Sequence, residues 1–370
     1  METIGLVTWY LGANYGSVLQ AYALRQALLR EGFNVYYPRF FEYPFTLKNV
    51  KVNLFTRFGI RRKKLLQDCP YPRQKEKFLS LFREEFPSRF PVTWLQNKIM
   101  CHGTDIFMAG SDQIWNCHDH FRSFEFLGFA GGKKRVSYAS SIGTGDIPEQ
   151  YREKVKKYLE KFSFIGVRES SAEKALKELT GRSDIRTVLD PTFLLTPAQW
   201  DSFAAGATSS VPLTGEYIFC YFLRKPSDYA AHIRKVMEQT GISRAILLPS
   251  CYFPNDIPQG VTLVDDAGPK EFIKALRGAA YVLTDSFHGS ALSVNFSRQF
   301  ANLRRFDDSD PASQNSRLYD LADMFGTGNR FFEGTLPEPI DYNIVSSRLS
   351  DLRRKSLDFL EAETRQGGKQ

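Results

Sequence analysis

The segment Thr284–Ser290 combines a histidine with several small polar residues. It follows an apolar run, Ala279–Leu283, and precedes a helix-like segment, so we expect it where a strand ends and a helix begins. The first turn of a helix offers free backbone N–H groups that bind anions, and His288 adds a side chain that exchanges a proton near neutral pH. A lone histidine is more often a core residue bonded to the backbone, but these small polar neighbours favour chemistry here.

Two other turns rich in small residues also follow apolar runs. Gly12–Ser17 lies between an apolar run and a helical pattern that starts at Val18. It is typical of a phosphate-binding turn at a helix N-terminus, although it lacks the lysine of a P-loop, and a plain tight turn is the alternative. Gly110–Asn116 places Trp115 among amide and carboxylate side chains, as in many sugar sites. A capped helix start with a core Trp115 explains the same residues equally well.

Arginines supply the candidate positive charges. Arg168 follows the apolar run Phe164–Val167 and could bind a carboxylate or phosphate through two hydrogen bonds, or simply pair with Glu169 at the surface. Arg305 and Arg317 lie downstream of the histidine, where either a positive lining near a phosphate-bearing substrate or solvated surface charge accounts for them.

Strand and helix patterns alternate along the chain, which predicts a parallel α/β sheet. The first strand–loop–helix–strand unit spans Ile4–Tyr37, and a second series of strands starts at Tyr217. A small, polar segment at 204–210 separates the two series. We therefore predict an N-terminal domain at 1–205 and a C-terminal domain at 211–344, facing each other across a cleft. Residues 345–370 are expected to form a helix and tail, with the N-terminal domain as the candidate packing partner.

The net charge of +8 suggests acidic partners such as phosphorylated molecules, anionic glycans, nucleic acid or a membrane surface. Nucleic acid is disfavoured because no recognised binding motif accompanies the charge. An insertion at about 45–75 holds seven Lys or Arg and no acidic residue between Lys48 and Lys64, interleaved with apolar residues. It could contact the anionic inner face of the cell membrane, or it could be a solvated insertion that packs on the core.

Five cysteines at irregular spacing argue against a disulfide framework and predict a cytoplasmic protein. No signal peptide or membrane-spanning run is expected. Cys101-His102 and Cys117–His120 contain zinc-type ligands, but their spacing fits no usual pair pattern, so no metal site is predicted.

Seven segments, taken in order, resemble the polysaccharide pyruvyl transferase family. Each is short, and together they extend from residue 14 to residue 317. The segments are Asn14–Tyr22, Gly110–Asn116, Tyr138–Gly143, Val167–Ser170, Leu189–Thr192, Asp285–Gly289 and Asn315–Arg317.

The resemblance implies two Rossmann-like domains facing a cleft, as in GT-B glycosyltransferases, with the domain at 1–205 on the acceptor side and the domain at 211–344 on the donor side. It also implies the catalytic pair His288 and Arg168. Where some members carry an arginine just before the histidine, this chain has Ser286 and Phe287, and Arg305 or its neighbour is the nearest match to a lysine that some members carry later. The substrate-binding candidates are Asn14, Tyr15, Gly16, Ser17, Gly110, Ser111, Asp112, Trp115, Asn116, Ser140, Ser286, Gly289, Ser290, Arg305, Asn315 and Arg317.

Members of the family transfer the enolpyruvyl group of phosphoenolpyruvate to a sugar, forming a pyruvyl ketal without a metal or redox cofactor. For this bacterial-type chain the resemblance implies a glycan or lipid-linked sugar acceptor in capsule or exopolysaccharide synthesis. A histidine with a reference pKa of about 6.5 suits protonation of the methylene carbon. The alternatives are a GT-B glycosyltransferase that uses a nucleotide sugar and a glycan-binding protein without activity.

Overall fold

The computed structural model describes residues 1–38, 69–89, 102–118, 120–224, 228–250, 257–310 and 312–365. Within these ranges the chain forms two parallel β-sheets flanked by helices, as the alternating pattern predicts. The predicted basic segment at 48–64 lies outside the described residues, as does the rest of the insertion before residue 69. No helix in the described ranges is both long and apolar enough to span a bilayer.

The first sheet belongs to the N-terminal half of the chain. Its strands are β1 (Thr3–Val7), β2 (Asn34–Pro38), β3 (Ser88–Arg89), β4 (Ile106–Ala109), β5 (Lys134–Ser140), β6 (Phe164–Val167) and β7 (Arg186–Thr187). They lie in the order β3-β2-β1-β4-β5-β6-β7, and all pairs are parallel. β1 and β4 are buried along their whole length, which explains why they read as continuous apolar runs.

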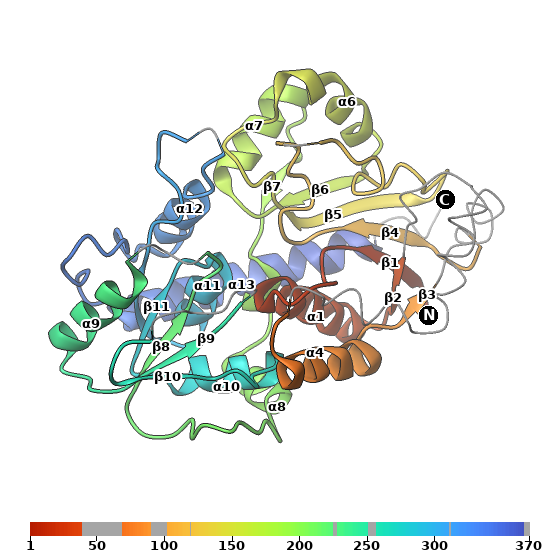
Figure 1. The fold of residues 1–370 in the computed structure, drawn as a ribbon. Coiled ribbons are helices and arrows are strands. Elements are labelled where there is room, and N and C mark those ends of the chain that lie inside the picture. Colours follow the sequence, from red (N-terminus) through yellow and green to blue (C-terminus); the bar gives the residue numbers. More distant parts are fainter. Residues whose placement is uncertain are drawn as a thin grey trace, which may run out of the picture.

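The helices of the N-terminal half lie around this sheet and at its junction with the second half (Figure 1). They are α1 (Tyr15–Arg30), α4 (Pro72–Glu85), α6 (Glu149–Leu159), α7 (Ser170–Thr180), the short 3-10 helix η1 (Pro191–Phe193) and α8 (Pro197–Phe203). α6 and α7 lie on one side and α1 on the other (Figure 1). α1 begins three residues before the predicted start at Val18, because the Asn14 side chain caps it by accepting from the Ser17 N–H.

The second sheet has the same construction. Its strands are β8 (Ile218–Tyr221), β9 (Ala245–Leu248), β10 (Val261–Leu263), β11 (Tyr281–Thr284) and β12 (Gln299–Asn302). They lie in the order β10-β9-β8-β11-β12, with every pair parallel. The helices of this half are α9 (Tyr229–Thr240), α10 (Pro269–Gly278), α11 (Phe287–Asn295) and α12 (Ser316–Phe325).

The two halves share a continuous apolar core, and α1 and α11 lie where they meet (Figure 1). The last helix, α13 (Tyr342–Arg365), contacts both halves. Its Ser356 Oγ accepts from the Leu189 backbone N–H at 3.0 Å, and Arg353 donates to Asn295 Oδ1 on α11 at 2.8 Å. α4 forms a second connection, since Gln74 donates to the Pro249 carbonyl at 3.0 Å. The halves are therefore joined by specific polar contacts as well as by the core.

Candidate active site

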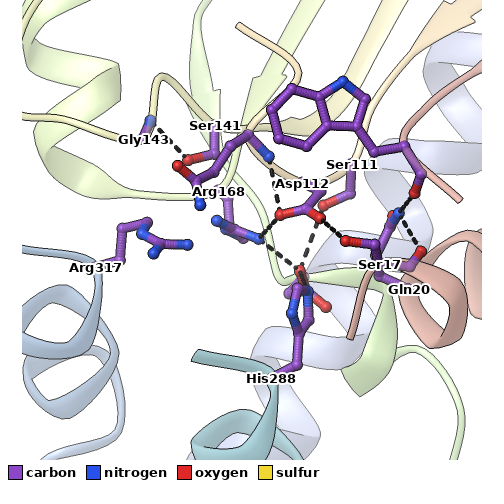
Figure 2. A network of polar contacts seen from close by, with 12 residues as sticks. Ser17, Gln20, Ser111, Asp112, Ser141, Gly143, Arg168, His288 and Arg317 are labelled. Carbon is purple, nitrogen blue, oxygen red and sulfur yellow. Dashed lines mark hydrogen bonds and ion pairs between the residues drawn. The ribbon is translucent and has the colours of Figure 1, made fainter. Parts of the chain in front are cut away.

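The polar segments selected from the sequence follow the carboxyl ends of strands in both sheets. Ser17 comes after β1, Asp112 after β4, Arg168 after β6 and His288 after β11. Ligands of open α/β sheets bind at this edge. Figure 2 shows that these four side chains, delivered from both halves, meet in one polar cluster.

His288 is the second residue of α11. Ser286 caps this helix by accepting from the Gly289 backbone N–H at 3.3 Å. The imidazole is only 6% exposed, and its Nε2 lies 3.5 Å from Asp190 Oδ2. This distance suits ion pairing but is long for a hydrogen bond, so Nε2 has no hydrogen-bond partner among the described residues. The imidazole is thus held next to a carboxylate with one nitrogen still able to bond.

Gly16, at the start of α1, lies directly against this imidazole. A Cβ atom at position 16 would fall 2.2 Å from His288 Nδ1 and 2.6 Å from its Cγ. Real Cβ atoms do not approach other atoms so closely. Only glycine therefore leaves room for the histidine ring in its present position.

Arg168 is buried among three carboxylates. Its Nε donates to Glu169 Oε1 at 2.7 Å, and its Nη1 lies 3.2 Å from Asp190 Oδ2 and 3.5 Å from Asp112 Oδ1. Burial opposes the charge, but these three carboxylates outweigh it and raise the pKa of Arg168. Nη2 alone of its nitrogens is left without a partner among the described residues. Arg168 therefore organises the acidic groups and retains one free donor.

Asp112 and Asp190 are both buried and ionised. Burial raises the pKa of each carboxyl, but His288 and Arg168 outweigh it, so both pKa values fall below the usual range. Asp112 Oδ2 also accepts from Ser17 Oγ at 2.6 Å. Each carboxylate is thus fixed by partners from different elements, and its orientation is set before any ligand arrives.

Arg305 and Arg317 point to one shared oxygen on the other side of the cluster. Gln314 Oε1 accepts from Arg305 Nη2 at 2.7 Å, from Arg317 Nη2 at 2.8 Å and from Gln113 Nε2 at 3.1 Å. Among the described residues, no carboxylate lies within 4.0 Å of either guanidinium, in contrast to Arg168. Burial, and then the neighbouring cations, lower the pKa of Arg317 to about 9. Figure 2 shows Arg317 pointing toward Arg168 without an ion-pair partner.

Two predicted binding residues are core residues instead. Trp115 is fully buried, stacks on Phe126 with ring centres 5.5 Å apart, and donates its indole N–H to the Glu125 carbonyl at 3.1 Å. Tyr15 is also fully buried, and its hydroxyl donates to the Ala267 carbonyl at 2.6 Å. Neither ring offers a face to a ligand, so the expectation that Trp115 stacks on a sugar, and that Tyr15 binds substrate, is wrong.

Several other predicted binding residues have local structural partners. Asn14 and Ser286 cap helices. Ser140 is buried and donates to the Ala109 carbonyl. Ser290 is also buried, and it donates to Asn302 Oδ1. Asn315 donates to Phe306 O and Asp308 Oδ1, and Asn116 donates to Gln113 Oε1. Gly110 and Gly289 lie where a Cβ would meet Tyr138 O and Thr284 Oγ1.

The side chains that meet at the cluster are those of Ser17, Ser111, Asp112, Arg168 and His288, with Gly16 against them and Arg305 and Arg317 beside them.

Residues outside the predicted set complete the cluster. Asp190 contacts both Arg168 and His288, and its place in Leu189–Thr192, one of the seven segments that carry the family resemblance, was the sequence signal that could have identified it. Gln314 has no such signal, because its partners come from three separate segments.

Two cavities lie near the cluster. One of about 10 Å³ is lined by Arg168, Glu169 and Arg317 among others, and it is the size of a single water. Another of about 790 Å³ lies between β7, α12 and α13, and none of the predicted site residues lines it. Among the described residues, no group of His, Cys, Asp or Glu side chains is arranged to hold a metal ion. Cys101 and Asp119 of the weighed zinc-type clusters lie outside the described residues.

Comparison with known proteins gives a family and a fold. A family model described as polysaccharide pyruvyl transferase matches residues 14–305. No curated protein matches the chain.

Solved structures resemble the fold at low sequence identity. A candidate UDP-N-acetylglucosamine 2-epimerase from Listeria monocytogenes is 12% identical with a TM-score of 0.54, and the match covers 97% of this chain and 90% of that one. An MnaA–UDP complex from S. aureus is 11% identical with a TM-score of 0.53, and the match covers 98% of this chain and 91% of that one. The glycosyltransferase SnogD from Streptomyces nogalater is 12% identical with a TM-score of 0.45, and the match covers 98% of this chain and 97% of that one. The predicted fold class, two Rossmann-like domains of the GT-B kind, is confirmed.

Proposed function

The chain belongs to the polysaccharide pyruvyl transferase family, and we propose that it transfers the pyruvyl group of phosphoenolpyruvate to a sugar. The product is a cyclic pyruvyl ketal on two sugar hydroxyls, and phosphate leaves. The acceptor that we propose is a sugar of a cell-surface polysaccharide or of a lipid-linked glycan precursor. The protein would bind it on the cytoplasmic side of the cell membrane.

The observation that carries this proposal is that the buried Arg317 and the half-buried Arg305 have no counter-ion among the described residues. Arg317 is 5% exposed and, like Arg305, is bonded to a neutral amide oxygen rather than to a carboxylate. Buried charges are normally paired, because an isolated one is costly. An anionic oxygen in the place of Gln314 Oε1 would supply that missing partner. Phosphoenolpyruvate offers such oxygens on both its carboxylate and its phosphate.

We assign to His288 the role of the acid in this reaction. It gives a proton to the methylene carbon of the donor, which becomes a methyl group, and the neighbouring carbon becomes an oxocarbenium-like electrophile. One sugar hydroxyl adds there and its proton goes to the imidazole, which restores the acid. The C–O bond to phosphate then breaks, and the second hydroxyl adds to the same carbon, closes the ring and gives its proton to the departing phosphate. Asp190 lies beside the imidazole and fixes its position, and Arg168 in turn holds the Asp190 carboxylate in place.

A ligand panel tests the donor. We expect phosphoenolpyruvate to raise the melting temperature of the protein, because it pairs with Arg305 and Arg317 in the folded state only. A nucleoside diphosphate is the comparison, since a nucleotide-sugar glycosyltransferase would be stabilised by it instead. Acceptor-dependent phosphate release from phosphoenolpyruvate is the second readout. Stabilisation by the nucleoside diphosphate without any by phosphoenolpyruvate would refute the proposed donor.

The contact between Gly16 and His288 gives a separate prediction. Gly16→Ala should lower kcat by about 100-fold, because the new methyl group displaces the imidazole by an ångström or so. The matched control is Gly132→Ala, where a Cβ meets nothing within 4 Å. Phosphate release by the two variants is the measurement. Equal activity in both would show that the position of His288 is not critical.

A further inference from the structure

The loop between β1 and α1 exposes an indole ring. Trp9 is 36% exposed and Leu11 is 39% exposed, whereas Trp115 and Trp200 are fully buried. A single exposed apolar side chain is ordinary, but two within three residues of one loop, one of them aromatic, form an apolar surface of the kind that can bind a ligand. Trp9 is therefore a candidate contact for a ligand.

Hydrogen bonds to the indole N–H and to the backbone carbonyl hold Trp9 in place. Its indole N–H donates to Glu125 Oε1 at 3.0 Å, and that buried carboxylate also pairs with Arg122 at 3.2 Å. The backbone carbonyl of Trp9 accepts from the Nε2 of the fully buried Gln20 at 2.9 Å. Since both the polar edge and the backbone are fixed, what remains for a ligand is apolar ring surface in a defined orientation.

A continuous series of hydrogen bonds connects this loop to the catalytic cluster. Gln20 Nε2 also donates to the Ser17 carbonyl at 2.8 Å, and Ser17 Oγ donates to Asp112 (Figure 2). On the other side of the loop, Thr8 Oγ1 donates to the Ser111 carbonyl at 3.1 Å. The Trp9 loop thus lies beside the carboxyl ends of β1 and β4, at the same edge of the sheet as the cluster.

We propose that Trp9 is the platform on which the acceptor sugar stacks. The apolar C–H face of a pyranose covers an indole ring, while its hydroxyls need amide and carboxylate partners. The segment after β4 supplies such groups in Gln113 and Asn116, which are half-buried and follow Asp112 of the cluster. This inference rests on the proposed function for the identity of the sugar as acceptor, and it assigns to Trp9 the stacking role that the buried Trp115 does not have.

The kinetic signature separates stacking from a structural role. Trp9→Ala should raise the KM for the acceptor about tenfold or more, the equivalent of a stacking contact of about 1.4 kcal/mol, and leave the KM for phosphoenolpyruvate unchanged. Trp9→Phe keeps an aromatic face and should retain most of the affinity, whereas Trp9→Leu keeps only apolar volume and should not. Ile344→Ala, at a 66% exposed position on α13, is the control for loss of an exposed apolar side chain.

A binding experiment tests the platform without turnover. Saturation-transfer NMR with methyl β-D-galactopyranoside, methyl α-D-mannopyranoside and N-acetyl-D-glucosamine should show transfer to ring C–H protons of at least one sugar. That transfer should be lost in Trp9→Ala and kept in Ile344→Ala. Transfer that persists in Trp9→Ala, or no transfer from the wild-type protein, would overturn the inference. If sugar binding depends on Trp9 while phosphoenolpyruvate gives no stabilisation, the proposed donor fails and the platform stands.

Discussion

His288→Ala should lower kcat for acceptor-dependent phosphate release by about 10²–10⁴-fold, the range expected when a general acid is removed. The imidazole lies 3.5 Å from Asp190 and has no substitute, because no other histidine contacts the cluster among the described residues. Binding of phosphoenolpyruvate should survive, since the arginines that pair with it are unchanged. A fluorescence or thermal-shift titration with phosphoenolpyruvate alone measures that binding.

The matched control is His232→Ala on α9, where Nδ1 contacts only the Asp228 carbonyl at 2.9 Å and the ring lies edge-on to Phe332. Its kcat should equal that of the wild-type protein. If His288→Ala kept full activity, the proton would have to come from another group and the assigned role would be wrong.

Arg317→Met should have two opposite effects. The free protein should become more stable, by about 1–4 kcal/mol, because a buried cation without a carboxylate partner is replaced by an apolar side chain of similar length. Affinity for phosphoenolpyruvate should fall about 100-fold, because a charge-assisted pair with the donor is lost. Urea unfolding and a phosphoenolpyruvate titration measure the two effects on the same sample.

Arg330→Met is the control, since Arg330 is equally buried, at 3% exposed, but donates to three backbone carbonyls. Removing it leaves these carbonyls unpaired and should destabilise the protein. A loss of stability in Arg317→Met of the same size would mean that Arg317 is a structural residue, and the argument for an anionic donor would lose its support.

The elements that position the site were predictable because their signals are local. The apolar run Phe164–Val167 has the limits of β6, and the run Ala279–Leu283 ends one residue before β11 does, so Arg168 and His288 were expected at strand ends. A charged group directly after a buried strand must lie at the carboxyl edge of the sheet, whatever the rest of the fold does.

The remaining features depend on contacts between distant segments. Trp115 and Tyr15 were misjudged because their burial comes from Phe126, Ala267 and other remote partners. Trp9 is an example in the other direction, because it lies two residues after the apolar end of β1 and yet its ring is 36% exposed. Neither kind of error can be corrected from periodicity, which reports the face of an element and not what covers it.

The position of α13 has a consequence for folding during synthesis. The Leu189 backbone N–H, at the end of the first sheet, is buried and bonds to Ser356, which is made more than 150 residues later. Until α13 leaves the ribosome, that donor has no partner, and Asn295 on α11 lacks the hydrogen bond that Arg353 donates to it. The first half can collapse early, but it reaches its final stability only when the second half and α13 have been translated. Catalytic competence should therefore appear late and in a single step, rather than domain by domain.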